Sequence, residues 1–244
     1  MIKTLALVLK KQNLGETDRI VTIFSPSLGK KRVVAKAVRK PLSKLAGHLD
    51  TMMVSQLILT DKPELPTVIS ASLVESFEHL RTNLPELEKA YAVSKITERV
   101  IIEDVPQQAI FQLTVDTLVR INQQDPFTII WLKFLFDLAK LLGLGMTAFH
   151  CQKCQKKITG PAHWVELERA FYCQDCPSPG LSFPIEGNSL KMLQLLGRCS
   201  YQELTRLVVA EKVEQQVEEI LLRVITDWFN KPWQSYRALG GEND

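Results

Sequence analysis

The spacing of apolar residues changes once along the chain, near residue 76. Before that point apolar and polar positions alternate, as at Leu5, Leu7 and Leu9, and a period of two is typical of β-strands. Four more runs rich in Val, Ile and Thr follow, at residues 19–24, 32–38, 51–60 and 67–74. Five short strands in about 75 residues predict a small β-barrel, and the OB-fold is the leading candidate.

After residue 76 the apolar residues recur every three to four positions, which is the period of an amphipathic α-helix. This pattern predicts helices over 85–103, 107–122, 126–142, 188–196 and 211–229. Pro126 at the first helical position, after a capping Asp125, is a helix start signal. Ser200 and Glu203 have the spacing of a capping box, which predicts one further short helix.

Four of the five cysteines form two C-x2-C pairs, Cys151 with Cys154 and Cys173 with Cys176. Each pair presents two thiolates to one cation, and two such turns complete a tetrahedron, so the spacing predicts a Zn²⁺ site. The thiolates would fill every coordination position, which favours a structural role over a catalytic one. Residues 155–172 between the pairs are long enough for a short β excursion.

Three alternatives to a zinc site stay open: a redox dithiol, disulfides, and a site that no longer binds metal. A thioredoxin-like dithiol needs a βαβ context, which the pattern lacks. Disulfides do not suit a chain expected in a reducing compartment. His150 adjoins Cys151, and we expect it to be a bystander of the site.

Together the two periods and the cysteines predict an α+β chain with several domains. The N-terminal domain is a small β-barrel of the OB-fold type over residues 1–78. An α-helical domain follows over 79–149 and 181–244, and a zinc-ribbon-like segment over 150–180 is inserted into it. We therefore expect the cysteine segment to act through the shape of the fold.

The net charge of +3 hides an asymmetry between the two ends of the chain. Residues 1–49 carry eleven Lys or Arg against two acids, a local charge of +9 that leaves −6 for the remaining chain. Such a split indicates a polyanionic partner at the N-terminal end. The candidate nucleic-acid-binding residues lie on one hairpin and the loop after it: Arg19, Lys30, Lys31, Arg32, Lys36, Arg39, Lys40 and Lys44.

On a strand, Lys30, Arg32 and Lys36 share one face while Val33 and Ala35 take the other. A stripe of this kind follows a phosphate backbone with favourable counterion release. The alternative is a merely solvated face, and the lack of local acids counts against it. Phe24 is the only aromatic residue in the first 76, so we expect sequence-independent backbone contact with little base stacking.

The sequence carries no catalytic motif: G-x-S-x-G, the P-loop and H-E-x-x-H are all absent. We therefore do not expect an enzyme. No secretory signal is visible, and the most apolar stretch, 127–142, is short for a membrane span and contains charged residues. The expected location is the cytoplasm, with no membrane partner.

Residues 15–24 read G-E-T-D-R-I-V-T-I-F, and Gly29-Lys30 and a basic stretch ending at Lys44 follow. With Leu142-Gly143-Leu144 leading into the two cysteine pairs, the chain resembles the RecO recombination mediator family over nearly its whole length. The resemblance implies binding of single- and double-stranded DNA at the nucleoid and annealing of complementary strands. It also implies contacts with RecR and with the acidic C-terminal tail of single-strand-binding protein, and through them the loading of RecA.

Two other classes of function remain. One is a zinc-ribbon module that binds RNA or the transcription machinery, and a preference for RNA over DNA would identify it. The other is a redox or structural interaction protein, which tight stoichiometric zinc would argue against.

Overall fold

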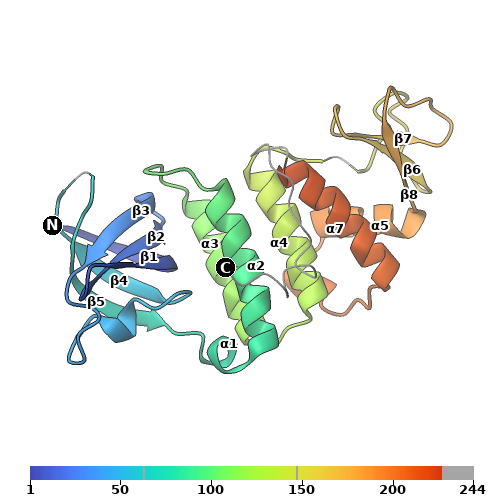
Figure 1. The fold of residues 1–244 in the computed structure, drawn as a ribbon. Helices are drawn as coiled ribbons and strands as arrows, with labels where there is room; N and C mark the ends of the chain where they lie inside the picture. The colour runs from blue at the N-terminus through green and yellow to red at the C-terminus, as the bar shows by residue number, and fades with distance from the viewer. Residues whose placement is uncertain (63, 147, 227–244) are drawn as a thin grey trace. The chain divides into compact units, whose positions relative to one another are not determined.

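The computed structural model describes residues 1–62, 64–146 and 148–226 (Figure 1). The chain divides into two compact units, Met1–Gln123 and Gln124–Asp244. The predicted helix 211–229 and the predicted domain segment 181–244 continue past residue 226, so their ends lie outside the described residues.

The first unit begins with five antiparallel strands, as the alternating pattern predicted. They are β1 Ile2–Leu14, β2 Asp18–Ser25, β3 Gly29–Ala35, β4 Val54–Leu59 and β5 Val68–Glu75. They form one sheet in the order β3-β2-β1-β4-β5, and a short 3-10 helix, η1 Ala46–His48, precedes β4. The edge strands β3 and β5 meet at a single parallel bridge, between Val34 and Thr67. One bridge is not a ladder, so the closed barrel stays a prediction.

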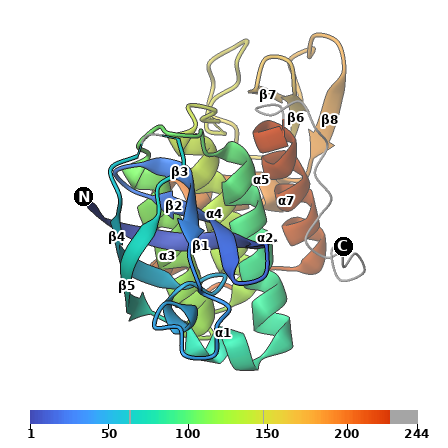
Figure 2. The ribbon, with the colours of Figure 1, turned by 60° about the vertical axis from the view of Figure 1, so that its left-hand side comes forward.

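Both faces of the central strands are buried. Ala6, Val8, Val21 and Ile23 belong to the hydrophobic core on one face of the sheet. The strands of the sheet are labelled in Figure 2. The opposite face is also covered, because helix α2 contacts β1 and helix α3 contacts β2. Phe24, the single aromatic residue of this segment, is fully buried on β2 and has no surface left for stacking.

The first unit is completed by α1 Glu78–Thr82, α2 Leu84–Val100 and α3 Gln108–Asn122. Helices α2 and α3 confirm the two helices predicted there, although α2 ends three residues earlier than expected. Helix α1 was not predicted, since five residues are too few for a helical period to show. On α3, the ring of Phe111 lies 5.4 Å from that of Phe24, edge to face, and joins the helices to the sheet.

The second unit contains α4 Phe127–Leu141, α5 Gly187–Arg198, α6 Tyr201–Leu204 and α7 Glu211–Thr226. Pro126 was predicted to be the first residue of α4, after a capping Asp125. In the structure Pro126 is itself the N-cap, so the prediction is wrong by one position. The capping box of Ser200 and Glu203 is present at α6. No helix in the described ranges is long and apolar enough to cross a membrane.

Helix α4 forms the centre of the second unit and packs against α5 and α7. Its Trp131 is fully buried and donates from Nε1 to Oε1 of Glu218 on α7, at 2.8 Å. Lys133 and Asp137 form an ion pair at 2.8 Å along one polar stripe of the otherwise apolar helix. This polar stripe agrees with a buried helix and distinguishes α4 from a membrane span.

Between α4 and α5 the chain forms a small three-stranded sheet. Its strands are β6 Ala162–Val165, β7 Ala170–Cys173 and β8 Ser182–Ile185, in the order β7-β6-β8. The β excursion expected between the cysteine pairs is therefore present. Strand β8 lies just after residue 180, where the cysteine segment was predicted to end. The two compact units divide between residues 123 and 124, within the predicted helical domain. The predicted domain boundaries stay predictions.

Candidate nucleic-acid interface and metal centre

The turn between β1 and β2 holds the basic loop that follows β3. Asp18 Oδ1 accepts hydrogen bonds from the Ala37 N–H at 2.7 Å and from the Thr17 hydroxyl at 2.9 Å. The Arg39 N–H donates to the carbonyl oxygen of Thr17, at 2.9 Å. The G-E-T-D segment therefore acts as a brace that gives the loop a defined shape.

This brace also explains where β3 ends. Ala37 has a φ of 52°, in the left-handed region, and its N–H points to Asp18 instead of into a ladder. The strand therefore runs over Gly29–Ala35, three residues earlier than the predicted 32–38. Lys36 consequently lies in the turn after the strand, and the prediction that it shares a strand face with Lys30 and Arg32 is wrong.

Asp18 is the one acid of the segment whose position among the basic residues is fixed by hydrogen bonds. Its pKa is lowered from 3.8, chiefly by the N–H of Ala37 and the Thr17 hydroxyl, with smaller contributions from Lys36 and Lys40. The carboxylate is therefore charged at neutral pH. Its Oδ1 accepts from the Ala37 N–H and the Thr17 hydroxyl, and Lys36 and Lys40 form no hydrogen bond or ion pair with it.

We call the exposed cations of this region the basic surface: Arg32, Lys36, Arg39, Lys40 and Lys44. Val33 and Ala35, beside Arg32, belong to the core, as the alternation predicted. Arg39 donates from Nη1 to the carbonyl oxygen of Gly15 at 3.1 Å. The other four side chains make no hydrogen bond or ion pair with the described part of the protein, so their charge is available to an anion.

Lys30 and Lys31, at the start of β3, are half-buried and have protein partners. The ammonium of Lys30 donates to the carbonyl oxygen of Glu98 at 3.2 Å, and that of Lys31 pairs with Asp104 at 2.7 Å. These contacts attach β3 to the last turns of α2 and to the connection between α2 and α3. Contact with DNA would compete with these bonds. A DNA-binding role for the two lysines stays a prediction.

Gly29 explains why this attachment is so close. A Cβ at this position would lie 2.2 Å from the carbonyl oxygen of Val105, and its φ of +70° also favours glycine. The backbone of β3 can therefore approach the connection only because no side chain intervenes.

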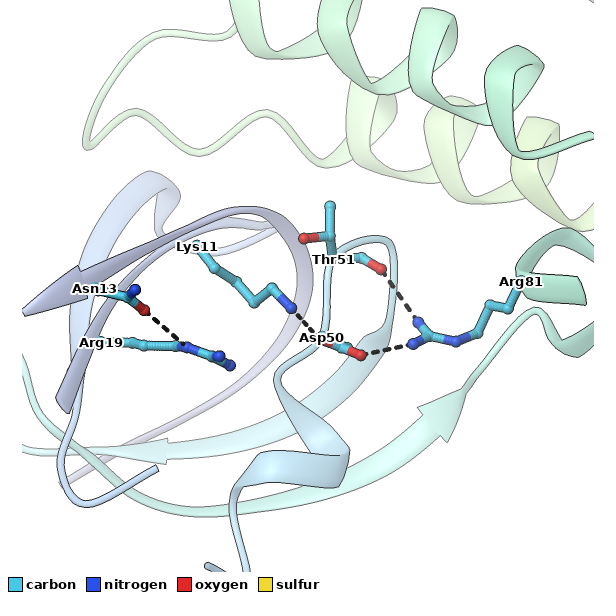
Figure 3. Close-up of polar contacts among 6 residues, drawn as sticks. All are labelled: Lys11, Asn13, Arg19, Asp50, Thr51 and Arg81. Atoms are coloured by element: carbon cyan, nitrogen blue, oxygen red, sulfur yellow. Dashed lines mark hydrogen bonds and ion pairs between the residues drawn. The ribbon is translucent and has the colours of Figure 1, made fainter. Parts of the chain in front are cut away.

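Arg19, the remaining predicted cation, lies on β2 and donates to Asn13 Oδ1 at 3.4 Å (Figure 3). On the same face of β1, Lys11 pairs with Asp50, which also accepts from Arg81 at 2.6 Å. Burial raises the pKa of Asp50, but the bonds to both cations outweigh burial, and the net pKa is lowered. Sequence reasoning missed this cluster, because it joins three distant segments and no motif marks it.

The four predicted metal ligands converge. The Sγ atoms of Cys151, Cys154, Cys173 and Cys176 all lie within 4.8 Å of one another, and those of Cys154 and Cys173 are 3.8 Å apart. Sulfurs at about 2.3 Å from a tetrahedral Zn²⁺ are separated by about 3.8 Å, so the thiol positions fit such an ion. His150 is not among the converging ligand atoms of the described residues, in agreement with its expected bystander role.

Local backbone bonds shape both cysteine turns. The N–H of Gln155, whose φ is 58°, donates to the carbonyl oxygen of Cys151, and the N–H of Cys176 donates to that of Cys173. Between the turns, the Gln152 N–H donates to the Phe171 carbonyl oxygen at 2.8 Å. Strand β7 thereby brings the second pair back to the first.

The ionisation of the thiols is consistent with a cation site. Burial opposes ionisation of Cys151, yet the backbone N–H groups of Cys154, Cys173 and Lys153 prevail and lower its pKa to about 6. Burial and the neighbouring thiols raise the pKa of Cys176 to about 12. One thiolate forms readily and discourages the next, so a full set of thiolates needs a metal ion to offset the charge.

Comparison with known proteins adds a second line of information. The family model "Recombination protein O N terminal" matches residues 1–77, and "Recombination protein O C terminal" matches residues 82–235. Several relatives carry the name DNA repair protein RecO. The one from Dehalococcoides mccartyi is 26% identical over 217 residues, which cover 88% of this chain and 86% of the relative.

Other bacteria have relatives of similar likeness. The DNA repair protein RecO of Acetivibrio thermocellus is 28% identical over 233 residues, 94% of this chain and 92% of its own length. That of Salinibacter ruber is 27% identical over 224 residues, 91% of this chain and 85% of its own. The likeness therefore extends over both the sheet and the helices.

Proposed function

The chain belongs to the RecO family and so has a role in DNA repair and recombination, and from this premise we propose how it acts. It binds single- and double-stranded DNA through the basic surface and anneals complementary strands. With RecR, it helps to load RecA onto DNA that is coated by single-strand-binding protein. The chain itself performs no catalytic step.

The observation behind this proposal is a set of exposed cations that form no hydrogen bond or ion pair with the described residues: Arg32, Lys36, Lys40 and Lys44. Each cation that meets a phosphate releases a condensed counterion, and this release drives binding without regard to sequence. Two DNA strands repel each other through their phosphates. A surface that neutralises both strands at once lowers this repulsion and accelerates pairing.

The remaining partners are part of the same proposal. RecR and the acidic C-terminal tail of single-strand-binding protein are the direct protein contacts, and RecA is reached through them. The site of action is the bacterial cytoplasm, at the nucleoid. An OB-fold barrel for residues 1–78 agrees with the strand order and with the bridge between Val34 and Thr67.

We propose Zn²⁺ as the ion of the four-cysteine cluster. Cys151, Cys154, Cys173 and Cys176 would hold it, and the filled ligand set would leave no open position for a reacting molecule. The ion would stabilise the small sheet β6–β8 and fix its surface.

The test of the proposed function is annealing of two complementary oligonucleotides that are first coated with the cognate single-strand-binding protein. We expect the protein to accelerate annealing, and the acceleration to fade as salt rises. Absence of acceleration, or a preference for RNA over DNA of the same sequence, would overturn the proposal in favour of a zinc-ribbon RNA-binding module.

A further inference from the structure

Phosphate contacts alone do not distinguish a single strand from a duplex. Proteins that prefer single strands usually stack unpaired bases on exposed aromatic rings. The only aromatic residue of the sheet, Phe24, is fully buried, so any stacking residue must come from elsewhere in the unit.

A pocket of about 190 Å³ lies between the end of β1, the loop before β4 and helices α1 and α2. Lys11, Asp50, Arg81, Leu87 and Tyr91 are among its lining residues. It therefore combines two cations, one acid, an apolar side chain and an aromatic ring.

The charged side of the pocket is built around Asp50. Its carboxylate pairs with both Lys11 and Arg81, and the Arg81 guanidinium also donates to the carbonyl oxygen of Thr51 at 3.4 Å (Figure 3). The side chains of Lys11 and Arg81 remain 27% and 34% exposed, so solvent still reaches them. Two cations share one acid, which leaves a net positive charge held in place for an incoming anion.

The opposite side of the pocket is formed by helix α2. Tyr91 is 41% exposed, and Leu87 precedes it by four residues, so the two side chains are neighbours on one helical face. A tyrosine ring on an apolar base is a rigid platform that needs little ordering on binding.

The pocket lies on the face of the sheet that leads to the start of the basic loop, whereas Arg32 lies on the other face. In the β1–β2 ladder Lys11 pairs with Val21 and Asn13 with Arg19, and in the β2–β3 ladder Arg19 pairs with Ala35. Lys11 and Arg19 therefore lie on one face, and Arg19 adjoins the strand end from which the basic loop departs (Figure 3).

We propose that this pocket binds one nucleotide of single-stranded DNA, with the base against the ring of Tyr91 and a phosphate at Lys11 and Arg81. The inference rests on the proposed function and adds a preference to it. A base in a duplex is paired and stacked on its neighbours, so it cannot reach the ring. The basic surface contacts both forms of DNA, and the pocket favours the single strand.

The experiment compares Tyr91→Leu and Tyr91→Phe with the wild-type full chain. Binding to a labelled oligo-dT and to a duplex of equal length is measured by fluorescence anisotropy at one fixed salt concentration. For Tyr91→Leu we expect binding to oligo-dT to weaken about 5- to 20-fold and duplex binding to stay within about twofold. Tyr91→Phe keeps the ring and should behave like the wild type.

Leu84→Ala is the matched control, because Leu84 is an exposed residue of the same helix that does not line the pocket. It should leave both affinities unchanged. Lys11→Gln should in addition lower the slope of log affinity against log salt for oligo-dT by about 0.7, the value for one lost phosphate contact.

The outcomes separate the inference from the proposed function. If the wild type binds neither DNA, the proposed function fails. If it binds both and Tyr91→Leu matches it, the proposed function stands and the pocket inference is overturned. An equal loss for oligo-dT and duplex also overturns the inference.

Discussion

Two pairs of lysines lie close together in the sequence and have opposite uses in the structure. Lys30 and Lys31 donate to Glu98 and Asp104 and attach β3 to the helices. Lys36 and Lys40, in the loop after the same strand, form no hydrogen bond or ion pair within the described ranges and stand in solvent. A run of basic residues is therefore not a uniform binding surface, because carbonyl oxygens and acids from distant segments hold some of its charges.

The largest expected effect concerns the four-cysteine cluster and tests whether the two units act separately. Cys151→Ser should abolish stoichiometric zinc and lower the free energy of unfolding by about 3 kcal/mol or more. Affinity for DNA, which we propose to reside in the first unit, should change by less than about twofold. Metal analysis, urea unfolding followed by tryptophan fluorescence and DNA binding measure these three quantities.

The control for this change is His150→Ala, which should retain the metal, because His150 is not among the converging ligands. A Cys151→Ser protein that still holds one zinc per chain would contradict the ligand assignment.

The next effect concerns the exposed cations of the basic surface. Reversal of Arg32, Lys36, Arg39 and Lys40 to Glu should weaken DNA binding about 100-fold or more, since four cations become four repulsive charges. The control reverses the same number of exposed lysines in the second unit: Lys140, Lys153, Lys157 and Lys191. Similar losses in both variants would show that net charge, and not the basic surface, governs binding.

The attachment of β3 through Lys30 and Lys31 depends on the neighbouring Gly29. Gly29→Ala should lower the free energy of unfolding by about 2–4 kcal/mol, because its Cβ would clash with Val105 and its φ is positive. Gly47→Ala, where a Cβ meets no atom within 4 Å, should cost less than about 0.5 kcal/mol. Urea unfolding curves of the two variants give both numbers, and equal values would refute the close approach.

A smaller effect concerns the brace at Asp18 that holds the basic loop after β3. Asp18→Ala should lower the melting temperature at pH 7, because the Ala37 N–H loses its acceptor. The pKa of Asp18 is lowered in the folded protein, so its stabilisation is present above the ordinary value of 3.8 and is lost as the pH falls through the folded value. The difference in melting temperature between wild type and variant should therefore shrink in acid.

Glu16→Ala removes the same charge from the same turn without breaking a hydrogen bond of the brace. It should change the melting temperature less than Asp18→Ala does. Equal shifts for the two variants would mean that charge alone, and not the bond to Ala37, supports the loop.

The parts of the structure that follow from local spacing could be predicted from the sequence. The alternation in the first 76 residues gave five strands, and the two C-x2-C pairs gave four converging thiols, because both patterns act over a few residues. The exact end of β3 could not be predicted, since it depends on a bond from Ala37 to Asp18 that forms only after folding.

Contacts between distant segments were also out of reach. Nothing near Lys31 in the sequence indicates Asp104, and nothing near Lys11 indicates Asp50 and Arg81. Base stacking was judged from the aromatic residues of the first 76 positions alone. Tyr91 joins the pocket from a helix that the strand pattern does not include.

The most direct test of the account uses two double variants that each remove two positive charges, Lys30→Gln with Lys31→Gln and Lys36→Gln with Lys40→Gln. The affinity for oligo-dT is measured over a range of salt concentrations. We predict that the loop variant lowers the slope of log affinity against log salt by about 1.4, the value for two lost phosphate contacts, while the strand variant keeps the wild-type slope. Equal slopes for the two variants would contradict the expectation that Lys36 and Lys40 contact phosphate while Lys30 and Lys31 are held by Glu98 and Asp104.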